Sequence, residues 1–566
     1  MTAQAPEVRA RVFQHFDVTG LLVALLAAWA SLSPTLLPRT WYFQGAVTGI
    51  ALVVGYGVGS LVAGAVRRVL RRRDPVAWWS PRTALVLRRL ALVGIAAGGG
   101  WVVVVAAREH AWTWRRLGYE PTSWGWAYVG IVALALATAG LVLVVARLIV
   151  ALWRLLHRAG RLVLPSWLAA LAAAVLVPWL VVVTLDTQVY ERVIDTANEG
   201  FALVDQVVDT SEQPAPASPY VSGGPASAQP WSSLGAEGRT WVGRAPDTDE
   251  LASVVPAGQA VTTPVRAFIG RHAAAEPEER AQLAVAELER LGGFARSAVL
   301  VMMPTGTGWV DEQVVRPLEH LLGGDVATVA TQYSHLPSPL AFLAERAGAQ
   351  ESARELVVAV RARLDEVPAR ERPRLYVAGE SLGAFALDGA FADLDALASD
   401  VDGAVLVGTP SMSRLRRQAE QERQPGSPQV RPVVGDGETV VFANRSRDLR
   451  ELLLAEDRTP PRAVFLQQPD DGVVWWDPRT AFSRPDWLAE PLAREVNPAM
   501  DWRPLVTFLN LTVDMVVSND FDEGAGHRYG QMPADAWRAI LRPGWDSAAV
   551  RRLHLTLQTI ERELTW

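Results

Sequence analysis

The chain has 566 residues, half of them apolar, and a formal net charge of −6. This length predicts at least two folding units, and the apolar fraction is high for a soluble protein. The sequence contains neither cysteine nor lysine, which excludes disulfides, thiolate zinc sites, cysteine nucleophiles and Schiff-base chemistry.

Residues 1–190 are basic and apolar, whereas the rest of the chain is acidic. The first part holds 18 Arg and 6 acidic residues, and the second holds 36 Arg and 54 acidic residues. Apolar runs in the first part approach the ~20 residues that cross a bilayer as a helix. They cover 18–37, 44–66, 90–107, 126–150 and 163–185. We therefore expect residues 1–190 to form a transmembrane domain of about five helices with the lipid bilayer as partner. Nucleic acid is not an expected partner, because the basic part is also the apolar part.

Arginines are concentrated in the second and fourth loops between these apolar runs. They are Arg67, Arg68, Arg71, Arg72, Arg73, Arg82, Arg88 and Arg89 in the second loop, and Arg154, Arg158 and Arg161 in the fourth. The positive-inside rule places both loops in the cytoplasm. With five spans, the sequence predicts a multi-pass cell-membrane protein whose large C-terminal part is extracytoplasmic.

Residues 191–260 are expected to form a linker, because the stretch 211–235 is rich in Pro, Ser, Ala and Gly. Beyond it, short apolar runs alternate with helical periods. Strands are predicted at 264–270, 297–303, 327–333, 374–378, 403–407, 463–466 and 507–517, with helices at 277–291 and 350–364. Nearly continuous apolar strands separated by helices indicate a mostly parallel sheet covered on both faces. Residues 261–566 are therefore expected to form an α/β domain.

The pentapeptide Gly379-Glu380-Ser381-Leu382-Gly383 lies between a predicted strand and an apolar segment. Glycines two positions before and after the serine permit the sharp, strained turn that lifts a nucleophilic hydroxyl clear of a parallel sheet. The same turn directs the Leu382 N–H toward the position of an oxyanion. This context predicts an α/β-hydrolase fold with Ser381 as its nucleophile.

A serine hydroxyl needs a base, and in this fold the chain order is serine, acid, histidine. His527 and His554 are the two histidines that follow Ser381. His554 falls in the helix-like segment 548–564, where a histidine on the polar face is the ordinary expectation. His527 follows Gly-Ala-Gly in a loop, so we select His527 as the base.

The acid is expected on the loop after the strand 463–466, where Asp470 and Asp471 stand side by side and spacing does not separate them. The second oxyanion donor of this fold comes from the loop after the third strand. Here that loop is 304–309, in which Thr305 and Gly306 are the candidates. The sequence predicts no cofactor and no metal site.

Segments spread along almost the whole chain resemble a bacterial family of multi-span membrane α/β-hydrolases, in which an N-terminal membrane domain precedes a catalytic domain. They are SLSPTLLPRTW (31–41), WSSLGAEGRTWV (231–242), PTGTGWV (304–310), QYSHLPS (332–338), GESLGAF (379–385), VVWW (473–476), RPDWL (484–488) and GHRY (526–529). The resemblance implies Ser381, Asp471 and His527 as the catalytic residues, and it favours Asp471 over Asp470.

Together these features predict a membrane-anchored serine hydrolase that cleaves carboxylic esters, in particular lipid or acyl esters, through an acyl-enzyme. The insertion 411–460 occupies the usual position of a lid. Two alternatives stay open: an acyltransferase with the same three residues, and a catalytically silent membrane scaffold. The sequence carries no signal for the oligomeric state.

Overall fold

A computed structural model describes residues 17–70, 81–119, 125–183, 214–455 and 457–564, together with residues 192, 194 and 196. The chain divides into two compact units. The helical unit comprises Met1–Leu185 and Pro478–Val517, and the α/β unit comprises Asp186–Asp477 and Ser518–Trp566. Part of the predicted second loop, at 71–80, and nearly all of the predicted linker before residue 214 lie outside the described residues.

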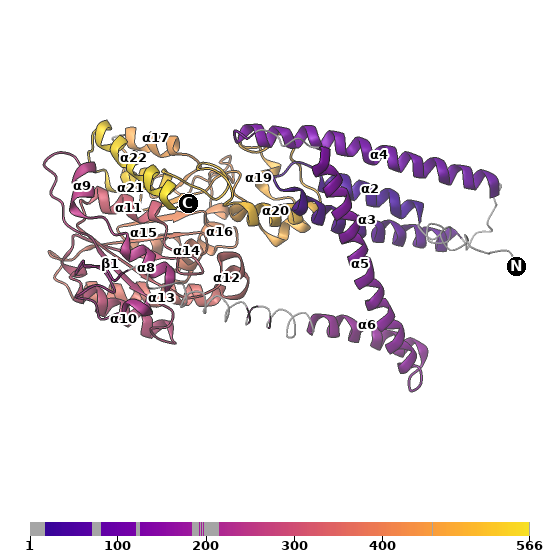
Figure 1. Cartoon of the computed structure of the whole chain (residues 1–566), viewed down its shortest axis with the longest axis horizontal. Helices are drawn as coiled ribbons and strands as arrows, with labels where there is room; N and C mark the ends of the chain where they lie inside the picture. The colour runs from indigo at the N-terminus through magenta and orange to yellow at the C-terminus, as the bar shows by residue number, and fades with distance from the viewer. Residues whose placement is uncertain are drawn as a thin grey trace. The chain divides into compact units, whose positions relative to one another are not determined.

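The helical unit contains one helix for each predicted apolar run. They are α2 (Val18–Ser31), α3 (Trp41–Leu70), α4 (Pro81–Arg116), α5 (Gly125–Gly160) and α6 (Ser166–Val183) (Figure 1). In the described part of the chain, three helices are long and apolar enough to cross a membrane: Trp41–Val69, Arg89–Arg116 and Trp126–Gly160. Helices α2 and α6 are shorter, so within the described residues each of the five predicted runs forms a helix but only three of these helices have the full length of a span.

Glycines in α3 allow it to approach α2 and α5 closely. A Cβ at Gly55 would lie 2.8 Å from the carbonyl oxygen of Val23 in α2, and a Cβ at Gly49 would lie 2.7 Å from that of Ala135 in α5. Such small-residue contacts bring helix backbones together where the hydrophobic effect gives little help, as in a bilayer. Gly49 and Gly55 of this apolar run therefore serve helix packing.

A segment far along the chain, Pro478–Val517, also belongs to the helical unit. It contains η5 (Pro478–Ala481), α19 (Asp486–Ala489) and α20 (Val506–Val517), and α20 packs on α2 and α3. The prediction of a strand at 507–517 is therefore wrong. In α20, the buried Asp514 accepts a hydrogen bond from the Leu36 N–H at 3.2 Å, and its other oxygen lies 3.7 Å from the guanidinium of the buried Arg39.

The α/β unit is built on a parallel sheet, as the sequence predicts. Its strands are β1 (Val265–Ile269), β2 (Ala298–Met303), β3 (Val326–Thr331), β4 (Arg374–Glu380), β5 (Gly403–Val407), β6 (Val440–Ala443) and β7 (Ala463–Leu466). All neighbouring strands pair in parallel, in the order β1-β3-β2-β4-β5-β7-β6. The carboxyl ends of all seven strands therefore meet at one edge, where ligands bind in folds of this kind.

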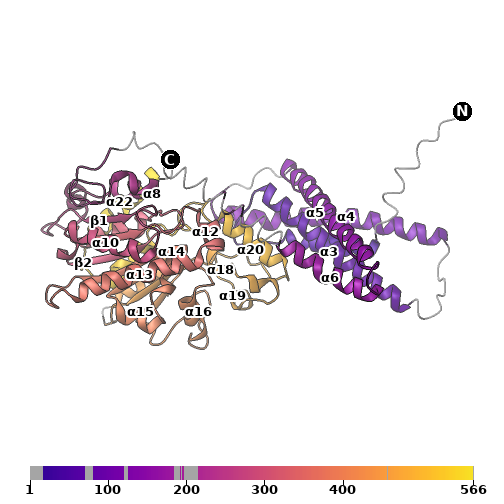
Figure 2. The same ribbon diagram turned by 90° about the horizontal axis from the view of Figure 1, so that it is seen from below.

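Helices cover both faces of the sheet (Figure 1). One face carries α10 (Pro277–Arg290) and α13 (Arg346–Asp365), toward which Figure 2 looks. The other carries α8 (Gly235–Gly243), α9 (Thr248–Val254), α11 (Glu312–Leu321), α21 (Met532–Leu541) and α22 (Ser547–Leu564), whose apolar side chains share one core with the strands. Shorter elements complete the unit: η2 (Trp231–Ser233), η3 (Gly293–Ala295), α12 (Ser338–Ala344), α14 (Leu382–Ala386), η4 (Leu387–Gly389), α15 (Leu394–Asp400), α16 (Arg414–Gln421), α17 (Ser446–Leu454) and α18 (Gly472–Trp475).

Two segments differ from their predicted roles. From residue 218 on, the predicted linker is part of the α/β unit, since Val221 bridges to β1 and Leu234 and Trp241 lie in its core. The predicted lid, 411–460, contributes β6 to the edge of the sheet and α17, which packs on α21. These contacts are made with parts of the chain that are distant in sequence. The Pro-rich composition of the first segment and the length of the second therefore did not reveal them.

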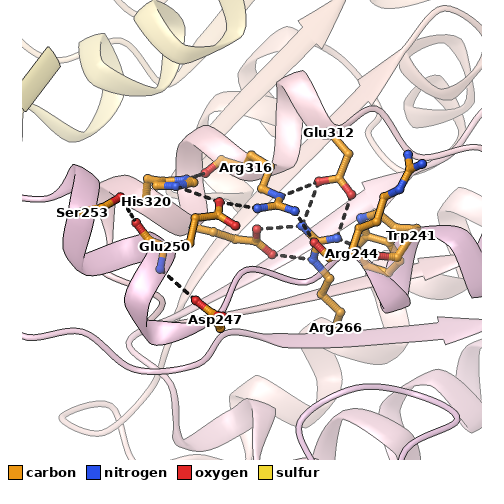
Figure 3. A network of polar contacts seen from close by, with 10 residues as sticks. Trp241, Arg244, Asp247, Glu250, Ser253, Arg266, Glu312, Arg316 and His320 are labelled. Carbon is orange, nitrogen blue, oxygen red and sulfur yellow. Dashed lines mark hydrogen bonds and ion pairs between the residues drawn. The ribbon is translucent and has the colours of Figure 1, made fainter. Parts of the chain in front are cut away.

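A buried ion network ties β1 to α11 (Figure 3). The fully buried guanidinium of Arg266 on β1 bonds Glu312 and Glu319 on α11, each through two contacts of 2.8–2.9 Å. It also donates to the Trp241 carbonyl of α8 at 2.7 Å, while Arg316 bonds the second oxygen of Glu312 at 3.0 Å. Burial acts to lower the pKa of Arg266, but the two carboxylates outweigh it and raise the pKa. Each of these buried charges is therefore compensated by an oppositely charged side chain.

Replacing Arg266 with Met is expected to lower the free energy of unfolding by about 3–5 kcal/mol, because Glu312 and Glu319 would keep buried charges without their main partner. Denaturant titration of the full chain in detergent measures this loss. The matched control is Arg354→Met, which removes an exposed ion pair with Glu351 and Glu355 and should cost less than about 1 kcal/mol. Equal losses for the two variants would contradict a structural role for the network.

Candidate active site

Ser381 occupies a strained turn between β4 and α14. It has φ 53° and ψ −116°, a backbone conformation that residues other than glycine rarely adopt. A Cβ at Gly379 would lie 2.5 Å from the backbone of Gly383, and a Cβ at Gly383 would lie 2.1 Å from the carbonyl oxygen of Met303. Both glycines of the predicted motif are therefore sterically required, and the turn has the geometry of a nucleophile elbow.

His527 is held by hydrogen bonds on its ring and on its backbone. Its Nδ1 lies 2.7 Å from Oδ2 of the fully buried Asp471, which follows β7, and the same oxygen accepts a 2.7 Å hydrogen bond from the Tyr529 hydroxyl. The His527 backbone N–H donates to the Ser518 carbonyl at 2.8 Å, and the Ser518 hydroxyl accepts from Gly472 N–H at 3.1 Å. Of the two neighbouring aspartates, Asp471 is the one placed against the imidazole.

The serine turn and the imidazole meet at the carboxyl end of β5. The Ser381 N–H donates to the Val407 carbonyl at 2.8 Å. The next residue, Gly408, has φ +57°, and a Cβ there would lie only 2.2 Å from Cε1 of His527. Thus Ser381 and His527 contact adjacent residues of the same strand end, and the absence of a side chain at Gly408 makes room for the ring.

The second ring nitrogen of His527, Nε2, is the atom that would receive a proton from Ser381. It is buried and makes no hydrogen bond within the part of the chain that the structure describes. The carboxyl group of Glu380 lies nearby, with its Oε1 4.0 Å from Nε2. Contacts between a nucleophile and its base are often long without substrate and shorten when substrate binds.

The predicted oxyanion residues lie at two neighbouring backbone segments. The Leu382 N–H is the first of α14 and therefore has no acceptor within the helix. The Thr305 N–H donates to the Trp309 carbonyl at 2.9 Å, which closes the loop after β2. That loop begins beside the elbow, since Met303 contacts Gly383. The Thr305 amide is therefore already engaged within the turn.

The other histidines of the α/β unit have different surroundings. His554 lies 3.4 Å from Asp535, and Nδ1 of His320 lies 2.8 Å from the Arg316 carbonyl within the ion network. The rings of His272 and His335 stack with centroids 4.6 Å apart. Among the described residues, no group of three His, Cys, Asp or Glu side chains is arranged to hold a metal ion.

Three neighbours of the site were not predicted as functional residues. The Tyr529 hydroxyl donates to Asp471, and Ser518 is hydrogen-bonded to both Gly472 and His527. Gly408 leaves space for the His527 ring. The GHRY segment was noticed as part of a resemblance, but nothing in its spacing assigns its tyrosine to Asp471. Ser518 and Gly408 carry no sequence signal, because their roles arise from packing alone.

Comparison with known families agrees with this geometry. Residues 265–553 match a model described as "Alpha/beta-hydrolase family", and residues 32–246 match one described as "Alpha/beta-hydrolase family N-terminus". No curated protein and no solved structure matches the chain significantly. The fold and the site define an α/β-hydrolase. The chain belongs to this α/β-hydrolase family, and its match to the N-terminal model covers α3 to α6 and continues to residue 246 in the α/β unit.

Replacing Gly408 with Ala is expected to slow the modification of Ser381 by a fluorophosphonate probe about 100-fold, because the new methyl group displaces the His527 ring. The rate of probe labelling measures the effect. Gly435→Ala is the matched control: Gly435 has nearly the same backbone angle, φ +56°, but no neighbour within 4 Å of a Cβ. Similar slowing in both variants would attribute the loss to backbone strain rather than to the ring.

Proposed function

We propose that the protein is a membrane-anchored serine hydrolase that cleaves carboxylic esters, in particular lipid or acyl esters, through an acyl-enzyme. The observation that carries the proposal is the joint placement of two features at Val407 and Gly408. One is the strained Ser381 turn, and the other is a histidine whose Nδ1 is bonded to a buried aspartate. A strained serine beside an oriented base is the arrangement that activates a hydroxyl group.

In the first half-reaction, the Ser381 Oγ attacks the ester carbonyl carbon while its proton passes to Nε2 of His527. Asp471 accepts from Nδ1–H, which fixes the tautomer that leaves Nε2 free to act as base. Backbone N–H groups of Leu382 and Gly306 stabilise the negative charge that develops on the carbonyl oxygen. The tetrahedral intermediate then expels the alcohol, which takes the proton from His527, and the acyl group stays on Ser381.

In the second half-reaction, water replaces the alcohol. His527 removes a proton from water, hydroxide attacks the acyl carbonyl, and the acid is released as Ser381 regains its proton. The Tyr529 hydroxyl and the Val473 N–H each donate to Asp471, so this carboxylate has partners for both oxygens while His527 is charged. These two bonds hold the carboxylate in a fixed orientation against the imidazole.

Membrane anchoring and an outward-facing α/β unit form part of the same proposal. Basic residues at the end of α5, among them Arg154 and Arg158, favour a cytoplasmic location for that end. The side of the membrane on which the α/β unit lies then depends on whether α6 crosses the bilayer. Its 18 residues span ~27 Å as a helix, close to the ~30 Å hydrocarbon core. A crossing by α6 would carry the chain outward.

Replacing Ser381 with Ala should abolish labelling by a fluorophosphonate and lower the hydrolysis of short acyl esters by at least about 1,000-fold, because no other group can form the acyl-enzyme. Ser399→Ala, an exposed serine on α15, is the control and should behave as wild type. Thermal unfolding of both variants checks the fold. A wild-type protein that is never labelled, or a labelled Ser381→Ala variant, would refute the catalytic proposal.

An impermeant fluorophosphonate applied to intact cells should label the wild-type protein as fully as it does after lysis, because the proposed orientation exposes Ser381 to the outside. A C-terminal reporter fusion provides an independent readout of the same side. Labelling that appears only after lysis would reverse the orientation and leave the hydrolase proposal intact.

A further inference from the structure

The loop after β2, residues 304–309, is bonded to the segment that follows β3. Gln332 is the first residue after β3 and is 1 % exposed, and its Nε2 donates to the Thr307 carbonyl at 2.9 Å. Its Oε1 accepts the N–H of Arg271, which lies in the loop after β1, at 3.0 Å. Because β3 lies between β1 and β2 in the sheet, this one side chain joins the loops that follow both of its neighbours.

The two partners of Gln332 fix the direction of its amide group. The Thr307 carbonyl can only accept a hydrogen bond and the Arg271 N–H can only donate one, so Nε2 must face Thr307 and Oε1 must face Arg271. An ionised carboxylate or an apolar side chain of the same length could not make both bonds. The main chain of Gln332 is fixed as well, since its N–H donates to the Ile269 carbonyl of β1 at 2.9 Å.

The loop needs an external support because Thr307 lies between two glycines, Gly306 and Gly308, and glycine permits a wide range of backbone angles. The hydrogen bonds within the loop run from the Thr305 N–H to the Trp309 carbonyl and from the Gly308 N–H to the Thr305 carbonyl. Neither of them uses the Thr307 carbonyl. The bond from Gln332 to this carbonyl therefore restrains a peptide group that the internal bonds of the loop do not hold.

Both glycines also allow the loop to lie directly against the segment after β3. Gly308 has φ +92°, and a Cβ there would lie 2.9 Å from Cγ of Gln332. A Cβ at Gly306 would clash with the Leu336 carbonyl oxygen. The position of the loop is therefore set by contacts with residues 332–336 as well as by its own turn.

The same loop borders the proposed nucleophile. It follows Met303, whose carbonyl oxygen leaves no room for a side chain at Gly383 in the Ser381 turn. In the proposed reaction, an N–H of this loop and the N–H of Leu382 bind the ester carbonyl oxygen as it becomes negative. Such donors act when they lie ~2.7–3.1 Å from the oxyanion, so a small displacement of the loop would weaken them.

We propose that Gln332 is a positioning residue: through the Thr307 carbonyl it holds the loop 304–309 where the loop can bind the oxyanion. The inference rests on the proposed serine hydrolase. Gln332 acts here through the loop and not through contact with the substrate. Its loss should therefore affect the transition state, in which the oxygen is charged, and not the binding of the uncharged ester.

The test compares kcat and KM for p-nitrophenyl butyrate, with the full chain in detergent. Labelling with a fluorophosphonate to completion counts the active sites, so that kcat refers to folded enzyme. Gln332→Met keeps the approximate length of the side chain but removes both hydrogen bonds. Gln332→Asn keeps the amide but is one methylene shorter, so it cannot reach both partners.

The matched control is Gln259→Met. Gln259 makes the same kind of paired bonds outside the proposed site: its Oε1 accepts from Nε1 of Trp545 at 3.1 Å, and its Nε2 donates to the Leu321 carbonyl at 3.2 Å. This variant removes an equivalent pair of hydrogen bonds without touching the loop 304–309. Thermal unfolding of all variants measures any general loss of stability.

Gln332→Met should lower kcat by about 10–100-fold and change KM by less than about 2-fold, because a displaced donor loses part of the roughly 100–1,000-fold that an oxyanion donor contributes. Gln332→Asn should lower kcat in the same way, and Gln259→Met should leave kcat and KM as in the wild type. A trifluoromethyl ketone gives a second readout. Ser381 adds to its carbonyl group and places a charged oxygen at the same position, so its inhibition constant should rise by the same factor as kcat/KM falls.

Three outcomes would overturn the inference. The first is a kcat within about 2-fold of the wild type in the Gln332 variants, and the second is a raised KM with kcat unchanged, which is the pattern of a residue that binds the substrate. The third is an equal loss in Gln259→Met, which would assign the effect to stability. If Gln332→Met does not fold, Gln332→Asn decides. A wild type that is not labelled and does not hydrolyse the ester would instead refute the hydrolase proposal.

Discussion

The arrangement of the site depends on one steric constraint, the contact between the backbone of the Ser381 turn and that of β2. No side chain fits between Gly383 and the Met303 carbonyl, so the elbow lies directly on the neighbouring strand. This contact places the start of the loop after β2 beside the Ser381 turn. The turn also hydrogen-bonds to β5, which in turn contacts the imidazole. The Ser381 turn, the loop after β2 and the His527 ring are thus positioned by the adjacent strands β2, β4 and β5.

The sequence was most informative where a single physical requirement dominates. Strands β2, β5 and β7 are continuous apolar runs because both of their faces are buried, and they were predicted to within a few residues. Helix α20 was mistaken for a strand because its Val-, Leu- and Thr-rich stretch has the composition of one, and a short apolar run does not reveal its period. Strand β6 was missed, since it lies in a segment interpreted as a lid.

The same distinction applies to the site. Ser381 and His527 could be chosen from motif, chain order and elimination. The choice between Asp470 and Asp471 needed the three-dimensional structure, because adjacent residues differ mainly in the direction of their side chains. The resemblance favoured Asp471, which is the aspartate that faces the His527 ring. The glycine at 408 has no local signal, because its role depends on the His527 ring, which is more than a hundred residues away in the chain.

The membership of Pro478–Val517 in the helical unit has a practical and a biosynthetic consequence. A fragment cut at the start of the α/β unit would retain Ser381, Asp471 and His527, yet it would also carry α20 without the helices it packs on and Asp514 without Arg39. Simple truncation is therefore a poor route to an isolated α/β unit.

During translation, moreover, Ser381 and Asp471 are synthesised before this segment and His527 after it. The three proposed catalytic residues are therefore complete only after a late segment of the helical unit has been made.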